Sequence, residues 1–411
     1  MTKNSPRRRV IVIGGSLVGL IAGNRFHRMG WEVEIFERTV GNVEGRGAGI
    51  LILPGLVSGF RAAGADVSEH SLGVEVPARI ALDPTGWIVV ERPFVQVTTA
   101  WKCLYDSLKH VFPSERYHAG MTLERVEQDD DTVTACFAGG ERAEADLLVG
   151  ADGLRSTVRG QLLPDLKPTY AGYIAWRCLT DEGDLSEPTH ATLFNRFAVF
   201  IALGQQVIGY PVPGPDHSMQ PGRRQYNTAW YHPVPEHGLR RLMTDDAGRY
   251  HPSGISPALL SSRVRQEMVD KAAQVVAPQF AEAIRCARLH FFQPIVDLEL
   301  PRLVFGRVVI IGDAAFVARP HVAMGVPKGA GDAIALVEAI KLGGRDYLSA
   351  LEHFEAERLR VDRAIVARGR YLGSYMEAQL KSEEERGLAE ELRVPERMMM
   401  EMGVPMNLWL G

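Results

Sequence analysis

The chain has 411 residues, with 46 Lys and Arg residues against 50 Asp and Glu residues, for a net charge of −4. This balance excludes a large basic surface for a nucleic acid backbone, so we expect a small-molecule partner and no nucleic acid. Apolar residues make up 46% of the chain, and no apolar run reaches the roughly 18 to 20 residues that a membrane span needs. Length and composition therefore predict two or three globular domains without a membrane anchor.

The four cysteines, at positions 103, 136, 178 and 286, form no C-x-x-C pair. This spacing suits neither a zinc site nor a disulfide framework. Free thiols in a reducing environment are the simpler interpretation, which predicts a cytoplasmic protein without a bound metal.

The opening stretch "RRRVIVIGGSLVGLIAG", residues 7–23, has two interpretations. Arginines before an apolar run are typical of a secretory signal peptide. The same letters nearly spell the dinucleotide-binding turn G-x-G-x-x-G, with Ser16 in place of the middle glycine. The residues that follow favour the turn, because 17–29 have helical spacing and 31–36 form a short apolar strand that ends at Glu37. We therefore predict a βαβ unit that binds an adenine dinucleotide, with a purely structural glycine turn as the alternative.

Each part of this turn has a physical role. Gly14 permits the tight turn and Gly19 the close packing of helix on strand, while Ser16 is small and can donate its hydroxyl to a phosphate at the helix N-terminus. Glu37 is placed to accept hydrogen bonds from ribose hydroxyls. The predicted cofactor-binding residues of this unit are Gly14, Gly15, Ser16, Leu17, Val18, Gly19, Glu37 and Arg38.

Further along, "ADLLVGADG" and "GRVVIIGDAA" are continuous apolar runs typical of strands buried on both faces. Between them, residues 168–250 alternate aromatic and polar residues and predict antiparallel strands, and residues 257–290 predict helices. The fold class is therefore α/β, a Rossmann-like domain interleaved with an antiparallel-sheet substrate domain and followed by a helical C-terminal part. The predicted nucleotide-binding segments are 1–75, 101–167 and 291–345, the substrate-domain segments are 76–100 and 168–290, and the C-terminal helical region is 346–411.

Two further segments carry a resemblance to a known family. "GADGLRSTVR", residues 150–159, and "GDAAFVARPHVAMGVPKGAGDA", residues 312–333, resemble the second and third fingerprints of the class A flavoprotein monooxygenases, the single-component aromatic hydroxylases. The resemblance implies FAD as the cofactor, with Asp152 in its site, Asp313 on the ribityl chain, and Met324 and Gly325 facing the flavin ring. Arg46, in the glycine-rich loop after Glu37, either contacts FAD or substrate or is a solvated loop residue.

The position of Asp313 supports this assignment independently. It follows a buried strand, and ligands of open α/β sheets bind at the carboxyl ends of the strands. A helix N-cap is the structural alternative for this carboxylate. The chain has only one dinucleotide-type turn, so NADH or NADPH is expected to visit the flavin transiently rather than occupy a second Rossmann domain.

The chain departs from the family pattern at four positions: Trp101 replaces an arginine, Phe316 a histidine, Met324 a glutamine and Pro327 an asparagine. The stretches "RPHVAMGVPKGAGDA", "PTYAGYIAWR" and "GYPVPG", with the serine-containing "GGS" turn, resemble the branch of the family that hydroxylates dihydroxypyridines.

The resemblance implies a monooxygenase that uses NAD(P)H, FAD and O2 to hydroxylate a hydroxypyridine-like or phenolic ring through a flavin hydroperoxide. An enzyme of the same fold acting on a non-aromatic substrate, as a monooxygenase or a reductase, is one alternative, and a non-catalytic flavin-binding protein is another. A homodimer is common in the family and is expected here.

The substrate pocket is expected among the aromatic residues of the sheet domain. Histidine has an ordinary pKa near neutrality, so His321 can hydrogen-bond or deprotonate a substrate hydroxyl. Tyr210 is the other candidate catalytic group. Core packing is the alternative for the aromatic residues, and a loop histidine satisfied by the backbone is the alternative for His321. The predicted pocket residues are Tyr173, Trp176, Tyr210, Pro320 and His321.

Overall fold

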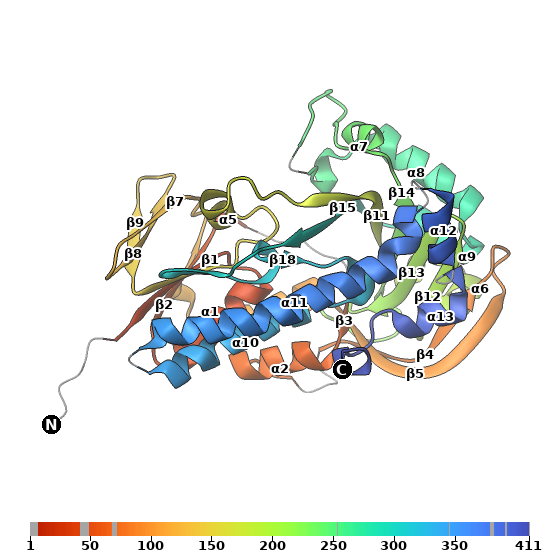
Figure 1. Cartoon of the computed structure of the whole chain (residues 1–411). Coiled ribbons are helices and arrows are strands. Elements are labelled where there is room, and N and C mark those ends of the chain that lie inside the picture. The colour runs from red at the N-terminus through yellow and green to blue at the C-terminus, as the bar shows by residue number, and fades with distance from the viewer. Residues whose placement is uncertain are drawn as a thin grey trace.

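The structure is a computed structural model that describes residues 7–41, 49–67, 72–252, 254–344, 346–378, 382–390 and 393–410. It contains two large sheets and one small sheet, covered by helices (Figure 1). The long helix α11 (Tyr347–Ala378) lies beside α10 (Gly325–Gly343) and packs against strands of both large sheets. The two large sheets therefore share one helical support.

The first sheet is the predicted Rossmann-like sheet. Its strands are, in spatial order, β16 (Val304–Phe305), β17 (Val308–Ile310), β10 (Leu147–Gly150), β1 (Arg9–Ile13), β2 (Glu32–Glu37) and β6 (Tyr117–Ala119). All its neighbours run parallel except β16 with β17. Every residue of β10 and β17 is buried, as their continuous apolar runs require. This sheet confirms the predicted strands.

The opening stretch forms β1, a glycine turn and helix α1 (Leu17–Arg28), which leads into β2. Gly14 has a φ of +103°, and its N–H donates to the Phe36 carbonyl at 2.8 Å. A side chain at Gly14 would overlap the Ala151 carbonyl, and one at Gly19 would overlap the Gly14 carbonyl. The predicted βαβ unit and the structural roles of both glycines are therefore confirmed.

The second sheet has nine strands and is antiparallel except where β12 meets β4. Its order is β18 (Phe316–Val317), β15 (Leu289–Glu299), β11 (Thr169–Asp181), β14 (Gln225–Pro233), β13 (Gln205–Val212), β12 (Arg196–Ala202), β4 (Val74–Leu82), β5 (Ile88–Ala100) and β3 (Gly49–Ile52). One face packs against α8 (Ser262–Val275) and α9 (Pro278–Arg285), and the other against α11 and α13 (Pro395–Glu401). A helical layer thus covers each face.

The remaining elements are peripheral to these layers. They are the three-stranded sheet β7 (Leu123–Gln128), β8 (Val133–Phe137) and β9 (Arg142–Ala145), and the helices α2 (Pro54–Ala63), α4 (Trp101–His110), α5 (Thr157–Leu162), α6 (Glu187–Leu193), α7 (Glu236–Leu242) and α12 (Glu383–Glu390). None of the helices in the described ranges combines the length and apolarity that a bilayer crossing requires. The four cysteines are free thiols.

The chain passes several times between the two large sheets. Strands β3 to β5 come from the first hundred residues yet belong to the second sheet, and β17 returns to the first sheet after residue 300. The predicted interleaving of the two parts agrees with this order. The segment boundaries given above stay a prediction.

The turn at Gly14 provides a test of the fold. Replacing Gly14 with Ala forces a side chain into a positive-φ backbone and against the Ala151 carbonyl, so we expect the free energy of unfolding to fall by about 1–3 kcal/mol. Urea denaturation measures this loss. Gly160→Ala is the matched control, because it lies in α5 with no atom within 4 Å of the added methyl group. An equal effect in both variants would contradict the strain at Gly14.

Candidate active site

A cavity of about 1060 Å³ lies where the two large sheets meet. Its lining includes Leu154 to Ser156 after β10, Asp313 after β17 and Gly325 at the start of α10. Residues of the second sheet, among them Tyr210 and Tyr231, complete it. The second and third sequence fingerprints therefore open into one cavity at the carboxyl ends of parallel strands, where ligands of such sheets bind.

The glycine turn leaves a polar group available at the start of α1. Ser16 is the N-cap of this helix in an extended backbone conformation, yet its side chain makes no capping hydrogen bond. Its hydroxyl is therefore not used by the helix, whose N-terminal dipole favours an anion. Glu37 is buried and accepts hydrogen bonds from the N–H groups of Gly15 at 2.9 Å and Thr39 at 3.0 Å. Glu37 thus holds the turn in place.

The other predicted residues of this unit have packing or surface positions. Leu17 is buried in the core of the first sheet, and Val18 lies against Gly312 and Gly329 of the third fingerprint. Arg38 is exposed after β2. Arg46 lies outside the described residues. Val18 therefore connects the first fingerprint to the third by direct contact.

Asp152 caps helix α5 instead of standing free. Its Oδ2 accepts hydrogen bonds from the N–H groups of Thr157 at 2.7 Å and Val158 at 3.3 Å. Its Oδ1 is buried and has no partner among the described residues, and burial raises its pKa. Arg159 of the same helix donates to the Ala314 carbonyl at 2.9 Å and so connects the second fingerprint to the third.

Two buried side chains hold the peptide groups of Gly312, the residue before Asp313. Gly312 has a φ of +63°, its N–H donates to Asp332 Oδ2 at 2.9 Å, and its carbonyl accepts from Lys328 Nζ at 3.0 Å. Lys328 and Asp332 lie one turn apart on α10 and contact each other at 3.1 Å. We call this pair the Gly312 clamp. It fixes the direction in which the Asp313 side chain leaves the backbone.

The clamp belongs to a buried cluster of four ionisable groups. On α11, Arg358 contacts Asp332 at 2.8 Å and Asp362 at 2.7 Å, and Asp362 lies 3.9 Å from Lys328. Burial opposes the charge on Lys328, but Asp332 and Asp362 outweigh it and raise the pKa of the amine. Burial, and then the neighbouring Asp332, raise the pKa of Asp362 to about 7, so at neutral pH Lys328 and Arg358 face one ionised carboxylate, Asp332, and a second carboxyl group that is partly protonated.

Asp313 is presented to the cavity by this arrangement. Its side chain is exposed to the cavity, although protein surrounds it on the other sides and this desolvation raises its pKa, with Lys328 acting in the opposite direction. No residue in the described part of the chain donates a hydrogen bond to its carboxylate, so it is not a helix N-cap. Its two acceptor oxygens are available to hydroxyl groups of a ligand.

His321 also lines the cavity and is buried against aromatic residues. Its Nε2 lies 2.9 Å from the Tyr173 hydroxyl, its ring lies 4.5 Å from that of Tyr231, and its Nδ1 has no partner among the described residues. Burial, with a smaller effect of Arg319, lowers its pKa to about 3. His321 is therefore a neutral imidazole at physiological pH, with one ring nitrogen unused.

The predicted pocket residues divide between the two faces of the second sheet. Tyr210, Pro320 and His321 line the cavity, and Tyr173 contacts it through His321. The prediction for Trp176 is wrong, because its side chain points to the opposite face, where Nε1 donates to His232. Successive residues of a strand point to opposite faces, so Tyr173 and Trp176 could not both line one pocket.

Three residues of the site were not predicted. Arg159 and Arg177 line the cavity, and Lys328 holds the backbone before Asp313. The signal for Arg177 was its spacing, four residues after Tyr173 in the same strand and so on the same face. No sequence signal could have shown that Lys328 is buried, because its partners Asp362 and the Gly312 carbonyl come from other parts of the chain.

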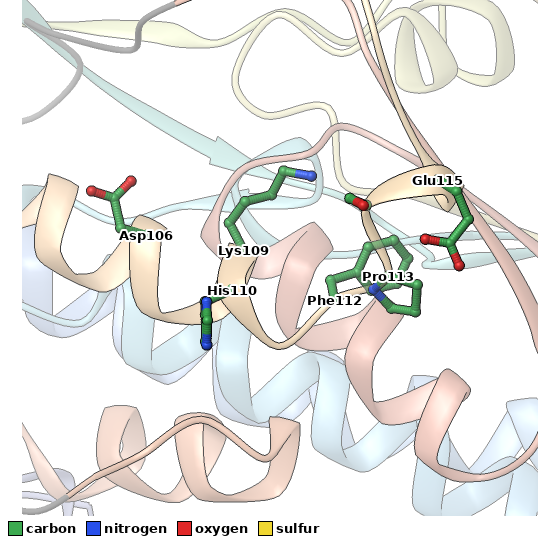
Figure 2. Close-up of a pocket in the computed structure, with 7 residues that line it drawn as sticks. Asp106, Lys109, His110, Phe112, Pro113 and Glu115 are labelled. Carbon is green, nitrogen blue, oxygen red and sulfur yellow. The ribbon is translucent and has the colours of Figure 1, made fainter.

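A second hollow, of about 670 Å³, lies over α4 and the turn that follows it. Figure 2 shows Asp106, Lys109 and His110 on the helix and Phe112, Pro113 and Glu115 after it. Lys109 Nζ lies 3.4 Å from the centre of the Tyr117 ring, whose hydroxyl donates to the Gly15 carbonyl at 3.0 Å. None of the predicted site residues lines this hollow, so we place the chemistry in the larger cavity.

The residues present fit FAD. Ser16 has an uncapped hydroxyl at a helix N-terminus, Asp313 has free acceptor oxygens, and a side chain added at Gly325 would meet no atom within 4 Å. Phosphate, ribityl hydroxyls and a flat ring would find complementary groups in these three places. Ser16 belongs to the first fingerprint, and Asp313 and Gly325 both belong to the third.

Comparison with known proteins agrees with this fit. A family model described as an FAD binding domain matches residues 7–179 and 294–369, and one described as FAD binding domain-like matches residues 170–297. The 2,6-dihydroxypyridine 3-monooxygenase of Paenarthrobacter nicotinovorans is 30% identical over 373 residues, which cover 90% of this chain and 91% of that protein. The chain belongs to the FAD-dependent aromatic hydroxylase family.

A second relative and two solved structures are also similar to this chain. The 3-hydroxybenzoate 6-hydroxylase of Polaromonas naphthalenivorans is 24% identical, over 92% of this chain and 90% of that protein. Among solved structures, the 2,6-dihydroxypyridine-3-hydroxylase of Arthrobacter nicotinovorans has a TM-score of 0.84 at 30% identity, with 91% of this chain and 94% of that chain covered. A Klebsiella pneumoniae protein complexed with FAD and uric acid shares the fold, with a TM-score of 0.74 at 22% identity over 96% of this chain and 95% of that chain.

These findings confirm the predicted family, the α/β fold with its antiparallel sheet, and FAD as the cofactor. The protein is an FAD-dependent monooxygenase, and NAD(P)H is the reductant of its class. The roles of individual residues stay predictions.

The Gly312 clamp generates the first prediction for the site. Lys328→Met removes the donor to the Gly312 carbonyl and leaves Arg358 alone against two buried carboxylates, so the free energy of unfolding should fall by about 3–5 kcal/mol. FAD affinity, read from flavin fluorescence, should weaken because Asp313 loses its fixed position. Lys341→Met, exposed at the end of the same helix, is the control and should change neither quantity. Unchanged FAD affinity in Lys328→Met would show that the clamp does not orient Asp313.

The buried neutral His321 generates a pH prediction. Its pKa is about 3 in the folded protein and 6.5 when exposed, so the unfolded chain binds more protons between these values and stability falls as the pH drops. His321→Gln should flatten this fall by up to about 1.4 kcal/mol per pH unit. Urea denaturation at several pH values measures it, with exposed His27→Gln as the control. The His321→Gln variant should keep part of the pH dependence of stability, because burial also lowers the pKa of His232, to about 4.

Proposed function

We propose that the protein hydroxylates a ring of the hydroxypyridine or phenol kind, using O2 and either NADH or NADPH. The observation that carries the proposal is the composition of the cavity. Asp313 and Gly325, which the resemblance places toward the flavin, line the same cavity as the buried group of His321, Tyr231 and Tyr210. Its volume of about 1060 Å³ suits a flat cofactor ring and a small aromatic substrate.

The relationship to a dihydroxypyridine hydroxylase supports the heteroaromatic substrate. That relative is 30% identical over 90% of this chain, so the similarity extends through the sheet that forms the aromatic wall. The wall consists of side chains that leave little room for water next to the substrate. A planar heteroaromatic ring with hydroxyl groups is the ligand that best complements aromatic faces and a few fixed polar groups.

Bound FAD supplies the electron transfer and the activation of oxygen. The protein's own side chains bind and orient the ring that is hydroxylated. Because His321 is neutral and its Nδ1 has no partner, this nitrogen can form a hydrogen bond with a ring hydroxyl. Burial raises the pKa of the Tyr210 hydroxyl, so it stays a hydrogen-bond donor and not a phenolate.

The setting of the reaction forms part of the same proposal. One dinucleotide turn serves FAD, so reduced nicotinamide reaches the flavin transiently. Free thiols at all four cysteines are consistent with a cytoplasmic enzyme. A homodimer, common in the family, is the proposed assembly.

The test is turnover by the purified yellow protein. We expect 2,6-dihydroxypyridine or another hydroxylated ring from a small panel to accelerate NAD(P)H oxidation, with one oxygen atom from labelled O2 in the product. Flavin reduction measured without O2 gives the effect of the ring on the first half-reaction. Acceleration only by non-aromatic compounds would favour the alternative substrate class. If neither NADH nor NADPH reduces the flavin in the presence of any compound of the panel, this result would indicate a non-catalytic flavin-binding protein.

A further inference from the structure

Arg319 and Tyr173 lie behind His321 in a chain of buried contacts that ends at the cavity. The buried guanidinium of Arg319 donates two hydrogen bonds to Asp297 of β15, at 3.0 and 2.7 Å. Burial raises the pKa of Tyr173, and Arg319 opposes this rise by its charge and by a hydrogen bond to the hydroxyl. The same hydroxyl lies 2.9 Å from His321 Nε2. A fixed cation therefore reaches the imidazole through one tyrosine.

Helix α11 makes room for this chain with two glycines one turn apart. A side chain at Gly373 would overlap the Tyr173 hydroxyl oxygen and the Arg319 side chain, and one at Gly369 would crowd the Arg319 backbone. Tyr173 itself is fully buried. The helix thus closes over the pair and keeps water away from the hydroxyl group, so its proton must find an acceptor within the protein.

The Tyr173 proton has one such acceptor. A guanidinium carries only donors, so Arg319 approaches the Tyr173 oxygen at its lone pairs, and the hydroxyl proton points away from the cation. Among the described residues, His321 Nε2 is the only acceptor that this proton meets. Tyr173 therefore donates to Nε2, and the proton of the neutral imidazole lies on Nδ1.

The opposite tautomer leaves more groups without a partner. With a proton on Nε2, both the Tyr173 O–H and the lone pair of His321 Nδ1 are buried and unused. With the proton on Nδ1, only the Nδ1–H is unused, because Nδ1 has no partner in the described part of the chain. Each hydrogen bond that a buried group fails to form costs about 1–3 kcal/mol, so the Nδ1–H tautomer is favoured.

The surroundings also oppose an imidazolium. Burial, and to a smaller extent the charge of Arg319, lowers the pKa of His321 to about 3. The nearby carboxylate of Asp297 is occupied by Arg319 and accepts a further hydrogen bond from Arg370 at 3.1 Å. A general base works best with a pKa near the working pH, so His321 is poorly suited to take a proton from a ligand.

We propose that Tyr173 and Arg319 are positioning residues that hold His321 in its Nδ1–H form, so that His321 donates a hydrogen bond to the aromatic substrate and does not remove its proton. This inference rests on the proposed function and gives one of its contacts a direction. The substrate must place an acceptor, such as a hydroxyl or carbonyl oxygen, against Nδ1. An aromatic amine fits poorly there, because its lone pair is shared with the ring and its N–H groups face another donor.

The position of the proton on His321 can be measured directly. Nitrogen-15 NMR of the FAD-bound enzyme, labelled at histidine, distinguishes a protonated ring nitrogen from an unprotonated one. The signals of His321 are those that disappear in the His321→Asn variant. At neutral pH we expect a protonated Nδ1 and an unprotonated Nε2. Tyr173→Phe removes the donor to Nε2, so both signals should move toward those of a mixture of the two tautomers.

A matched pair of ligands tests the donor role. Resorcinol and 1,3-diaminobenzene keep the spacing of the two groups of 2,6-dihydroxypyridine without a ring nitrogen. Titration against the absorbance of the bound flavin gives a Kd for each without turnover. We expect the wild type to bind resorcinol roughly 5- to 50-fold more tightly, and Tyr173→Phe to reduce this ratio to less than about threefold.

The control is Tyr226→Phe. It removes another buried hydroxyl from the same sheet, on the opposite face, where this hydroxyl has no partner among the described residues. It should match the wild type in the His321 signals and in the ratio of the two Kd values. FAD content and the thermal midpoint show whether each variant is folded.

Three results would overturn the proposal. The first is a wild-type His321 with its proton on Nε2, and the second is a Tyr173→Phe variant whose signals and Kd ratio equal those of the wild type. The third is a wild type that does not prefer resorcinol. Failure of the proposed function is a separate outcome, because it is measured as the absence of ring-stimulated NAD(P)H oxidation and leaves the NMR result intact.

Discussion

The close approach of three strand ends is the constraint on which the rest of the site depends. The ends of β1, β10 and β17 carry the three fingerprints, and they meet only because glycines occupy the crowded positions. A side chain at Gly14 would overlap the chain after β10, and Val18 fills the space beside Gly312 and Gly329. Residues some 300 positions apart thus form one surface, from the start of α1 to the start of α10. The cofactor site follows from backbone packing before any polar side chain is considered.

The buried charge cluster extends this constraint to the helices. Lys328 and Asp332 hold Gly312 from both sides, and Arg358 and Asp362 on α11 complete the cluster. Since α11 also packs against the second sheet, one helix supports both the Gly312 clamp and the sheet whose residues line the cavity. Buried ion pairs often contribute little net stability, but they penalise every arrangement that separates them. Here they fix the register of α10 against α11 and so the position of Asp313.

Much of the first sheet could be predicted from the sequence, because its signals are local. Neighbouring residues are enough to recognise the run around Gly14, the continuous apolar strands and the acidic residues that follow strands. Trp176 shows the limit of such reasoning, since composition marks an aromatic wall but only the strand register decides which face each ring occupies. Lys328 shows a second limit, because the sequence marks a lysine as a surface residue unless its partners are known. Both errors arise from contacts between residues far apart in the chain.

The groups that line the cavity differ in the charge that the fold allows them. The buried charge cluster holds the backbone before Asp313, whose carboxylate faces the space where hydroxyl groups are expected. Burial lowers the pKa of His321 and raises the pKa of Tyr210 and Tyr231, so all three are neutral at physiological pH. The cavity therefore offers a carboxylate acceptor at Asp313 and neutral hydrogen-bonding groups at His321 and the two tyrosines, while the aromatic side chains supply its shape.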